Sequence, residues 1–301
     1  MKLNKFLAVF LCVAMVFGVM TFSASALEFE YYESVDSDFE VEAEEATAAL
    51  LSDEQPSENW IEDADTSWYS EDGTDFEIGT AEELAGLAKL VNEGTAFHNA
   101  NFVTKTITLT DDIDLDGKMW TPIGNAGGDR GKDNGFFPFM GTFDGNEFTI
   151  SNVSVYDTNE PNLKYANLGL FGSIGKYDDA PITTVKNLTV NNAKVITSQI
   201  TSQLGSNVAA VIGNANASTV ITNVHLTGTV EIEGWSFIGG IVGHGYPQMS
   251  DCSVEAEGTI HAYQWCCGAL VGYLGEGADV YDSSVIGTND GLAISTEMAQ
   301  V

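Results

Sequence analysis

Basic residues are scarce in this chain, which has 11 Lys and Arg against 44 Asp and Glu and a formal net charge of −33. Such a charge repels phosphate backbones and acidic lipid headgroups, so nucleic acid and anionic membrane surfaces are excluded as expected partners. Prolines number only 6, and cysteines only 4. The 31 glycines follow no Gly-X-Y period, which excludes collagen. The apolar content of 44% is nevertheless enough to bury a core.

Familiar catalytic motifs are missing as well. The four histidines, His98, His225, His244 and His261, form no HExxH pair, which argues against a peptidase centre in this chain. The sequence has no GxSxG elbow, phosphate-binding loop or dinucleotide fingerprint. We therefore predict no catalytic residues, and calcium is the one cofactor that the sequence suggests.

The first 26 residues have the pattern of a secretory signal peptide. Lys2 and Lys5 precede an apolar run from Phe6 to Met20, and Ala24-Ser25-Ala26 is a small-residue cleavage site. The apolar run is shorter than the roughly 20 residues that span a bilayer. We predict a secreted, extracellular or cell-surface protein that is not an integral membrane protein.

An acidic segment follows the predicted signal peptide. Residues 28–77 contain nineteen Asp or Glu and no Lys or Arg. Self-repulsion of these charges predicts a disordered, extended leader over residues 27–77. Trp60, Trp68 and Tyr69 near its end are expected to dock onto the domain that follows.

One helix is predicted, within an N-terminal cap over residues 78–148. Thr80-Ala81-Glu82-Glu83 forms a capping box. Four apolar residues then recur at helical spacing before Gly94: Leu84, Leu87, Ala88 and Val91. This helix of about twelve residues is expected to cover the open N-terminal end of the repeats.

Residues 149–301 repeat the same short phrases. One phrase is an alternating strand with a central Asn or Asp, and its five copies centre on Asn152, Asn187, Asn223, Asp251 and Asp282. Another phrase has four residues and ends in glycine, and its copies are Gly169–Gly172, Ala210–Gly213, Gly240–Gly243 and Ala269–Gly272. In the best-kept part these phrases recur every 28 to 31 residues, a spacing typical of a solenoid.

Each period holds three short alternating strands separated by Gly, Asn or Asp. This pattern predicts an all-β fold, a right-handed parallel β-helix in which each strand stacks on its equivalent one coil earlier. The five central Asn and Asp residues are expected to stack at one corner. A β-sandwich would explain the alternation but not the repeated phrases.

The ordered set of phrases resembles GLUG-motif proteins. It comprises Gly169-Leu170-Phe171-Gly172, Gly240-Ile241-Val242-Gly243, the strand Asn187-Leu188-Thr189-Val190 and a lead-in from Leu109 to Gly145. The resemblance covers roughly residues 78–301 and implies a secreted or surface-displayed bacterial β-solenoid, often adhesin-like. The motif also accompanies some immunoglobulin-degrading metallopeptidases, but no catalytic residues belong to it. Ala210 and Ala269 depart from the motif by replacing its leading glycine.

Two groups of residues are candidate binding sites. Trp235, Tyr246, Tyr263 and Trp265 are expected at or beside the corners of neighbouring coils, where rings stack on sugars or anchor a protein. The alternative is that these rings only cover the coil edges.

Asp112, Asp114 and Asp116 open a calcium-like loop, with acids at the first, third and fifth places and Gly117 at the sixth. Ile123 occupies the place of the twelfth ligand, so period-two alternation, with the three aspartates facing water, is an alternative explanation.

These patterns predict a non-catalytic adhesion, binding or display module of a bacterial surface, with a glycan or a host or cell-surface protein as partner. The alternative is a carbohydrate-active β-helix enzyme, either a polysaccharide lyase or a glycoside hydrolase. The sole arginine, Arg130, lies in a glycine-rich loop over residues 125–135 that needs no chemistry.

The cysteines and the last coil leave two further expectations. Cys252 is expected in the core column of Val153, Leu188 and Val224, although a disulfide to Cys266 or Cys267 stays open. The chain stops at Val301, so the last coil either ends bare or belongs to a longer array. A bare rung with unpaired backbone groups predicts self-association.

Overall fold

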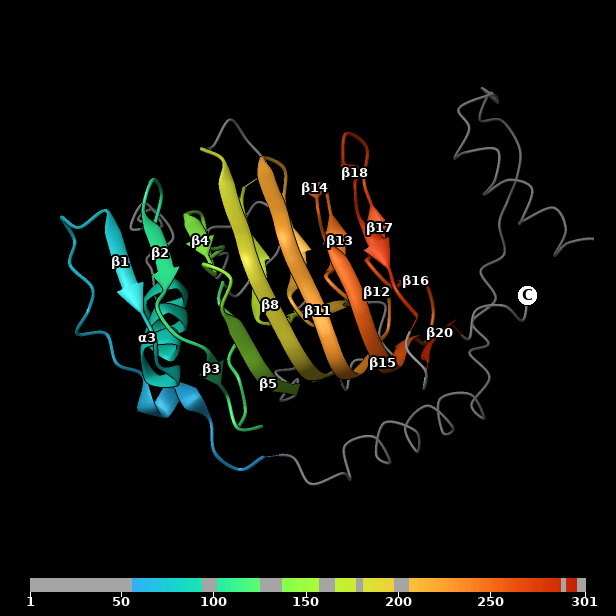
Figure 1. The fold of residues 1–301 in the computed structure, drawn as a ribbon, viewed down its shortest axis with the longest axis horizontal. Coiled ribbons are helices and arrows are strands. Elements are labelled where there is room, and N and C mark those ends of the chain that lie inside the picture. Colours follow the sequence, from blue (N-terminus) through green and yellow to red (C-terminus); the bar gives the residue numbers. More distant parts are fainter. Residues whose placement is uncertain are drawn as a thin grey trace, which may run out of the picture. The chain divides into compact units, whose positions relative to one another are not determined.

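The repeated phrases become stacked coils in a computed structural model, which describes residues 56–93, 102–124, 137–156, 166–176, 181–197, 206–287 and 291–296. All of these residues fall within the compact unit Glu40–Val301. Their strands form three sheets, and the strand pairs run parallel. Figure 1 shows the strands side by side along the stack. The prediction of an all-β parallel β-helix is confirmed.

The largest sheet has twelve strands, in the order β1-β2-β4-β8-β11-β14-β18 along its main path, with β3, β5, β15, β19 and β20 paired beside it. Their bounds are Asp75–Ile78 (β1), Thr106–Leu109 (β2), Ile113–Asp114 (β3), Thr142–Asp144 (β4), Thr149–Tyr156 (β5), Thr183–Ile196 (β8), Thr219–Gly234 (β11), Gln248–Ser250 (β14), Ser253–Ala262 (β15), Asp279–Tyr281 (β18), Ser284–Val285 (β19) and Leu292–Thr296 (β20).

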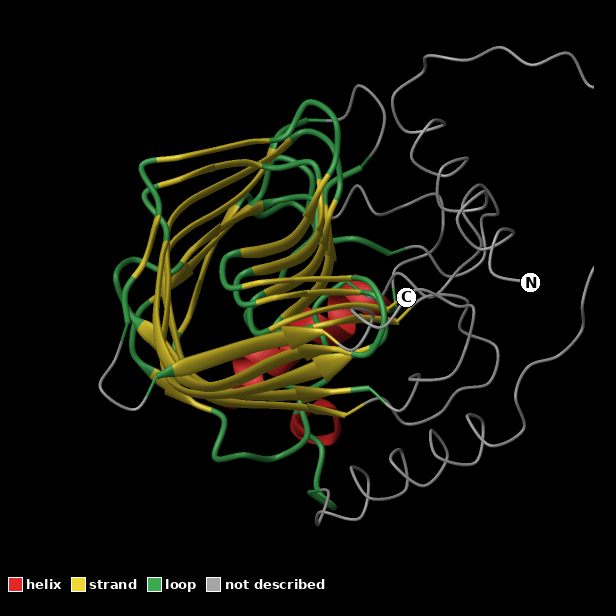
Figure 2. Cartoon of the chain, turned by 90° about the vertical axis from the view of Figure 1, so that its right-hand side faces the viewer, coloured by secondary structure: helices red, strands yellow, loops and turns green. Residues whose placement is uncertain are grey.

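Two smaller sheets have four short strands each. One contains Ala166–Leu168 (β6), Ser206–Ala209 (β9), Phe237–Gly239 (β12) and Cys266–Gly268 (β16). The other contains Phe171–Ile174 (β7), Ile212–Ala215 (β10), Val242–Gly245 (β13) and Val271–Leu274 (β17). In Figure 2, which looks along the stack, these short strands turn back on themselves at a tight bend.

The glycine-ending phrase forms this bend, because it joins the end of one short strand to the start of the next. A Cβ atom on Gly213 would lie 2.6 Å from the backbone nitrogen of Leu168 and 2.8 Å from the carbonyl oxygen of Asn207. The equivalent glycines come equally close to backbone atoms, and they are Gly172, Gly243 and Gly272. The two arms of the bend therefore meet backbone to backbone, which explains why the last glycine is present in all four phrases. The first position accepts alanine, as Ala210 and Ala269 show.

Asparagine and aspartate in left-handed backbone conformations form a corner of the large sheet. Asn187, Asn223, Asp251 and Asp282 have φ between 50° and 56° and lie level with one another in successive coils. Asn223 Nδ2 donates to Asn187 Oδ1 at 3.1 Å, and Asn187 Nδ2 donates to Asp144 Oδ1 at 2.9 Å. Short polar side chains tolerate this conformation, and here their amides also link the coils.

The predicted place of Asn152 is wrong. β5 pairs with β8 in a register that sets Asn152 level with Asn192, at a second corner. There Asn192 Nδ2 donates to Asn152 Oδ1 at 3.1 Å, and Asn152 Nδ2 donates to Asp114 Oδ1 at 2.7 Å. The first corner of that coil is formed instead by the turn after Asp144, because β4 pairs with the first residues of β8.

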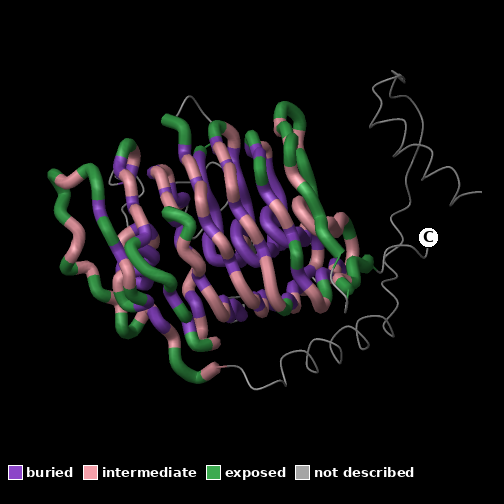
Figure 3. Tube along the Cα trace, in the orientation of Figure 1, coloured by how far each residue is buried: buried purple, intermediate pink, exposed green. Residues whose placement is uncertain are grey.

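Alternating residues face a continuous interior, which Figure 3 shows as buried segments running through the coils. Along β11, Val224, Leu226, Val230 and Ile232 are at most 1% exposed, and the residues between them are half-buried or exposed. At the corner, two successive residues, Thr222 and Asn223, are both half-buried. The alternation of buried and half-buried residues then begins again with Val224 in the interior.

The predicted helix is present as α3, over Ala81–Asn92, and Figure 1 places it beside β1 and β2. The capping box between Thr80 and Glu83 is formed. The four predicted apolar residues are at most 4% exposed. Asn92 at the helix end donates to the carbonyl oxygen of Pro122 at 3.0 Å and accepts from the amide of Gly124 at 3.0 Å, which ties the helix to the first coil.

Residues 56–77, which the charge pattern assigns to the extended leader, carry the 3-10 helix Trp60–Asp63 (η1) and most of β1. Trp60 is buried, donates from Nε1 to the carbonyl oxygen of Leu115 at 2.8 Å, and lies under the ammonium of Lys118. This part of the segment is held in place by apolar anchors despite its charge. The predicted signal peptide, the leader up to residue 55 and the Arg130 loop lie outside the described residues.

Candidate functional site

A chain of ring contacts crosses two successive coils, those of β11–β13 and β14–β17, which precede the last described coil. Its members are Phe237, His244, Tyr246, Trp265 and Tyr273, and we call them the aromatic row. The ring centroids of Trp265 and Phe237 are 6.2 Å apart, and those of Phe237 and His244 are 5.0 Å apart. His244 stacks on Tyr273 at 5.1 Å with nearly parallel planes and contacts Tyr246 at 5.7 Å.

Strand register builds the middle of this row. His244 on β13 pairs with Tyr273 on β17, and in the preceding coils the same column holds Asn214 and Ser173. His244 Nδ1 is hydrogen-bonded to Asn214 Oδ1 at 3.0 Å, and Asn214 Nδ2 donates to Ser173 Oγ at 3.4 Å. Along this column the side chains therefore change from a hydroxyl and an amide in the two earlier coils to aromatic rings, His244 and Tyr273, in the next two.

Exposure differs along the aromatic row. Trp265 is 53% exposed and Tyr273 is 40% exposed, whereas His244 is buried and Phe237 and Tyr246 are half-buried. Solvent thus reaches Trp265 and Tyr273 most, and the buried His244 contacts Phe237, Tyr246 and Tyr273. This arrangement presents aromatic faces and edges on a preorganised base.

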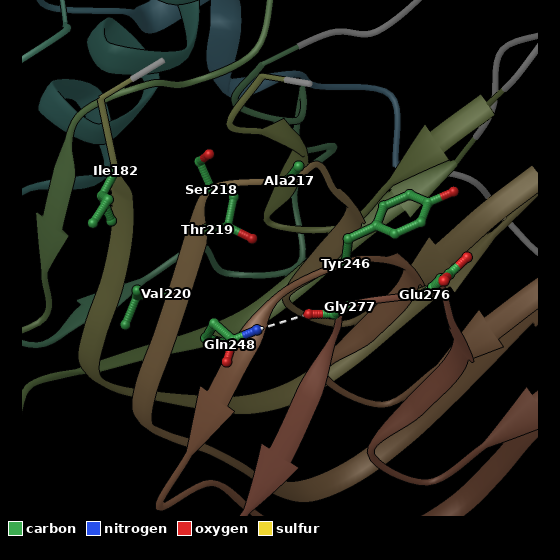
Figure 4. A pocket seen from close by; sticks show the side chains of 9 residues that line it. All are labelled: Ile182, Ala217, Ser218, Thr219, Val220, Tyr246, Gln248, Glu276 and Gly277. Carbon is green, nitrogen blue, oxygen red and sulfur yellow. Dashed lines mark hydrogen bonds between the residues drawn. The ribbon is translucent and has the colours of Figure 1, made fainter. Parts of the chain in front are cut away.

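A hollow of about 440 Å³ adjoins one end of the row, and Tyr246 belongs to both. Its lining comprises Ile182, Ala217, Ser218, Thr219, Val220, Tyr246, Gln248, Glu276 and Gly277. Gln248 Nε2 donates to the carbonyl oxygen of Gly277 at 2.9 Å, as Figure 4 shows. In that view the Tyr246 ring and the Glu276 carboxylate lie on the side of the hollow opposite Ile182. The Tyr246 ring lies against Gly275, where a Cβ atom would overlap it.

The other two predicted ring residues, Tyr263 and Trp235, make other contacts. The Tyr263 hydroxyl donates to Glu233 Oε2 at 3.1 Å, and its ring contacts His261 edge to face at 4.6 Å. The Trp235 amide donates to Ser206 Oγ at 2.8 Å. The structure thus links Tyr246 and Trp265 through Phe237, His244 and Tyr273, three residues that the sequence reasoning did not single out.

Glu233, beside Tyr263, has a raised pKa. Burial is the main cause, and the neighbouring Glu231 adds to it. The hydrogen bond from Tyr263 acts in the opposite direction, as do His261 and Lys194. Glu231 itself pairs with Lys194 at 3.0 Å.

The three predicted calcium ligands are exposed, while Ile113 and Leu115 between them are buried. Asp112 Oδ1 accepts from the amide of Thr149 at 2.8 Å, and Asp114 Oδ1 accepts from the amide of Asp116 at 2.8 Å. Among the residues that the structure describes, no three His, Cys, Asp or Glu are grouped to hold a metal ion. Calcium binding by Asp112, Asp114 and Asp116 stays a prediction.

The three described cysteines are free thiols. Cys252 is buried in the column of Val224 and Leu188, as predicted, whereas Val153 lies beside Ala193 and outside that column. Burial raises the pKa of the Cys252 thiol to about 11 and that of Cys267 to about 11. Both thiols are therefore protonated and poorly nucleophilic at neutral pH.

Apolar residues are unusually exposed on the last described coil. Val285 is 50% exposed and Ile294 is 44% exposed, although their partners one coil earlier, Val254 and Ile260, are fully buried. These two residues belong to interior columns that the preceding coils close. The described coil leaves that part of the interior uncovered.

Comparisons with known proteins do not establish a family for this chain. No protein-family model matches the chain, so the resemblance to GLUG-motif proteins depends on the motif residues themselves. The chain is 31% identical to halomucin of Haloquadratum walsbyi over 181 residues, which cover 59% of this chain. It spans about 2% of the length of halomucin. A solved structure of a candidate immunoglobulin A1 protease from Bacteroides ovatus matches 70% of this chain and 67% of its own, at 17% identity and a TM-score of 0.36, too low to establish a common fold. Within the described ranges, no helix is long and apolar enough to cross a membrane.

Proposed function

We propose that this protein is a non-catalytic, extracellular binding module that holds a glycan on its aromatic row. The observation that carries this proposal is the pair of exposed rings, Trp265 and Tyr273, which ring contacts through Phe237 and His244 join to the half-buried Tyr246. Indole and phenol rings offer an apolar face and a polar tip, which suits the mixed surface of a sugar. A hollow with Gln248 and Glu276 adds hydrogen-bonding groups at one end.

A place outside the cell is supported by the sequence. The signal-peptide pattern of residues 1–26 predicts export, and the excess of acidic residues favours a soluble, well-hydrated surface. The similarity to a short stretch of halomucin supports a repeat module that also occurs inside a much longer protein. A bacterial surface remains the setting that the GLUG resemblance implies.

The proposal is tested with residues 27–301 on arrays of plant, mucin and bacterial-wall glycans, followed by calorimetry on the best oligosaccharide. Replacing both Trp265 and Tyr273 by alanine should lower affinity at least tenfold, because each well-packed anchor ring is worth more than about 1 kcal/mol. Tyr281→Ala is the matched control, since Tyr281 is 51% exposed but lies outside the row. Equal affinity in the double variant and the control would remove the row as the binding site.

The second candidate function is a carbohydrate-active enzyme, and Glu233 is the observation in its favour. A carboxyl group with a raised pKa can act as a general acid, and Glu231 is two residues away on the same face of β11. Neither carboxylate lines the hollow beside Tyr246. Mass spectrometry of polysaccharides incubated with the protein decides this point, because cleavage that Glu233→Gln abolishes would establish the enzyme.

A further inference from the structure

Charge is distributed unevenly along the chain, and the aromatic row lies entirely in its acidic part. After Lys194 the sequence contains no Lys or Arg up to Val301, but it contains ten Asp or Glu. Ion pairs within the described residues involve Lys118, Lys186 and Lys194, all of which precede the row in the sequence. A ligand on the row therefore meets a predominantly negative field, because ten acidic residues outnumber the three histidines of this stretch, and such a field repels anions and attracts cations.

One carboxylate stands next to an accessible ring. Glu276 and Tyr246 line the same hollow, and the ring of Tyr246 lies against Gly275, the residue before Glu276. Figure 4 shows the carboxylate and the ring on one side of the hollow. An ammonium group at this place would pair with the carboxylate and lie within reach of the ring, and aromatic rings attract cations within about 6 Å of their centroid.

From this pairing we infer that the aromatic row selects glycans with free, protonated amino groups over neutral and acidic glycans. The inference rests on the proposed function, because it names the ligand class of the same site. The rings supply the stacking that any sugar shares, and Glu276 supplies the charge that distinguishes an ammonium from an acetamido group. Acidic glycans such as polyuronates are disfavoured, since the chain after Lys194, which includes the coils of the row, carries ten acidic residues and no lysine or arginine to pair with them.

The test compares two oligosaccharides with the same backbone, a hexamer of glucosamine and a hexamer of N-acetylglucosamine, by calorimetry on residues 27–301 at mildly acidic pH. An exposed ion pair is worth up to about fivefold in affinity, so the glucosamine hexamer should bind more tightly, by up to about fivefold for each ammonium group held. The difference should vanish at about 1 M salt, where the screening length falls to about 3 Å. Polygalacturonate serves as the anionic probe and should not bind.

Variants distinguish the preference for amino sugars from the proposed binding of glycans in general. Glu276→Gln should lower affinity for the glucosamine hexamer to that for the acetylated hexamer, and Glu255→Gln, an exposed acid on β15, should leave both affinities unchanged. Equal binding of the two hexamers, lost in the Trp265 and Tyr273 double variant, would overturn the amino-sugar preference and leave glycan binding intact. Binding of the glucosamine hexamer that the double variant retains would overturn the inference as non-specific attraction. Absence of binding to every glycan tested would overturn the proposed function.

Discussion

The last glycine of the repeated phrase makes a quantitative prediction for the stability of the coil. A Cβ atom at Gly213 would lie 2.6, 2.8 and 2.9 Å from three atoms of the facing arm, and all three are backbone atoms. Ordinary contacts of a Cβ atom begin at 3.4 Å, so a methyl group would overlap by about 0.5 to 0.8 Å. Backbone atoms cannot rotate away as a side chain can, and the two arms must therefore move apart.

This overlap sets the magnitude of the expected effect. Overpacking in a close-packed interior costs about 1 to 3 kcal/mol, and backbone contact on three atoms places Gly213→Ala at the upper end of that range. For a folded unit of this size, a loss of about 3 kcal/mol lowers Tm by about 6 to 12 °C. Gly287→Ala is the control, because a Cβ atom there meets nothing within 4 Å and the backbone conformation is ordinary.

The assay is thermal unfolding followed by circular dichroism, with both variants and the unmodified chain measured side by side. We expect Gly213→Ala to unfold well below the control and Gly287→Ala to match the unmodified chain within about 1 °C, as surface substitutions usually do. A Tm for Gly213→Ala equal to that of the control would refute the backbone-to-backbone contact. The glycine-ending phrase would then need a different explanation.

Four further predictions concern the corners, the acid response, calcium and the last described coil. Asn187→Ala should lower the free energy of unfolding, measured in urea, by about 2 to 4 kcal/mol, because it removes two hydrogen bonds between coils and places alanine at φ 52°. Asn187→Gly should recover the part of this loss that comes from the left-handed backbone conformation. Burial raises the pKa of Asp144, but hydrogen bonds from Asn187 and a lysine outweigh burial and leave the pKa lowered. The ionised Asp144 carboxylate therefore stabilises the fold above the unfolded pKa, and this stabilisation is lost as pH falls through the folded pKa. Asp144→Asn should remove this contribution, so the free energy of unfolding should fall less steeply below about pH 4. Asp112→Ala should weaken calcium binding in calorimetry, and unchanged heats would dismiss the site. Because Val285 and Ile294 are exposed, the unmodified chain should self-associate in light scattering, and the double variant Val285→Asp with Ile294→Asp should not. A concentration-independent monomer mass of the unmodified chain would contradict this prediction.

The fold could be predicted from the sequence because its constraints act locally and repeat. The capping box at Thr80 satisfies free backbone donors within one turn, so the start of α3 is readable without any tertiary information. The phrase around Asn223 recurs with a fixed spacing because each coil has a fixed length. The similarity of phrases wrongly predicts Asn152 at the first corner, because in its coil that corner is the turn after Asp144. Similar phrases do not show where a coil contains additional residues.

The candidate site was harder to predict, and His244 shows the reason. Its ring lies in the row because β13 and β17 are in register and because the short strands fold back at the bend, two facts that no single phrase contains. Tyr273 could not be predicted as a member of the row for the same reason, since it directly follows a glycine-ending phrase whose apolar residues predict core positions. The coil register is what identifies the column of Ser173, Asn214, His244 and Tyr273, and with it the middle of the row.

The column from Ser173 to Tyr273 shows how such a solenoid can gain a binding surface without changing its fold. Its four members occupy equivalent backbone positions and pair in one register. The first two use a hydroxyl and an amide to satisfy each other in a buried slot, and the last two use rings that stack. The backbone path is held by the glycines of the bend and by the asparagines of the corner, neither of which belongs to this column. The side chains in the column are therefore free to change from coil to coil, and binding chemistry can arise at one height of the stack while the coils above and below keep their geometry.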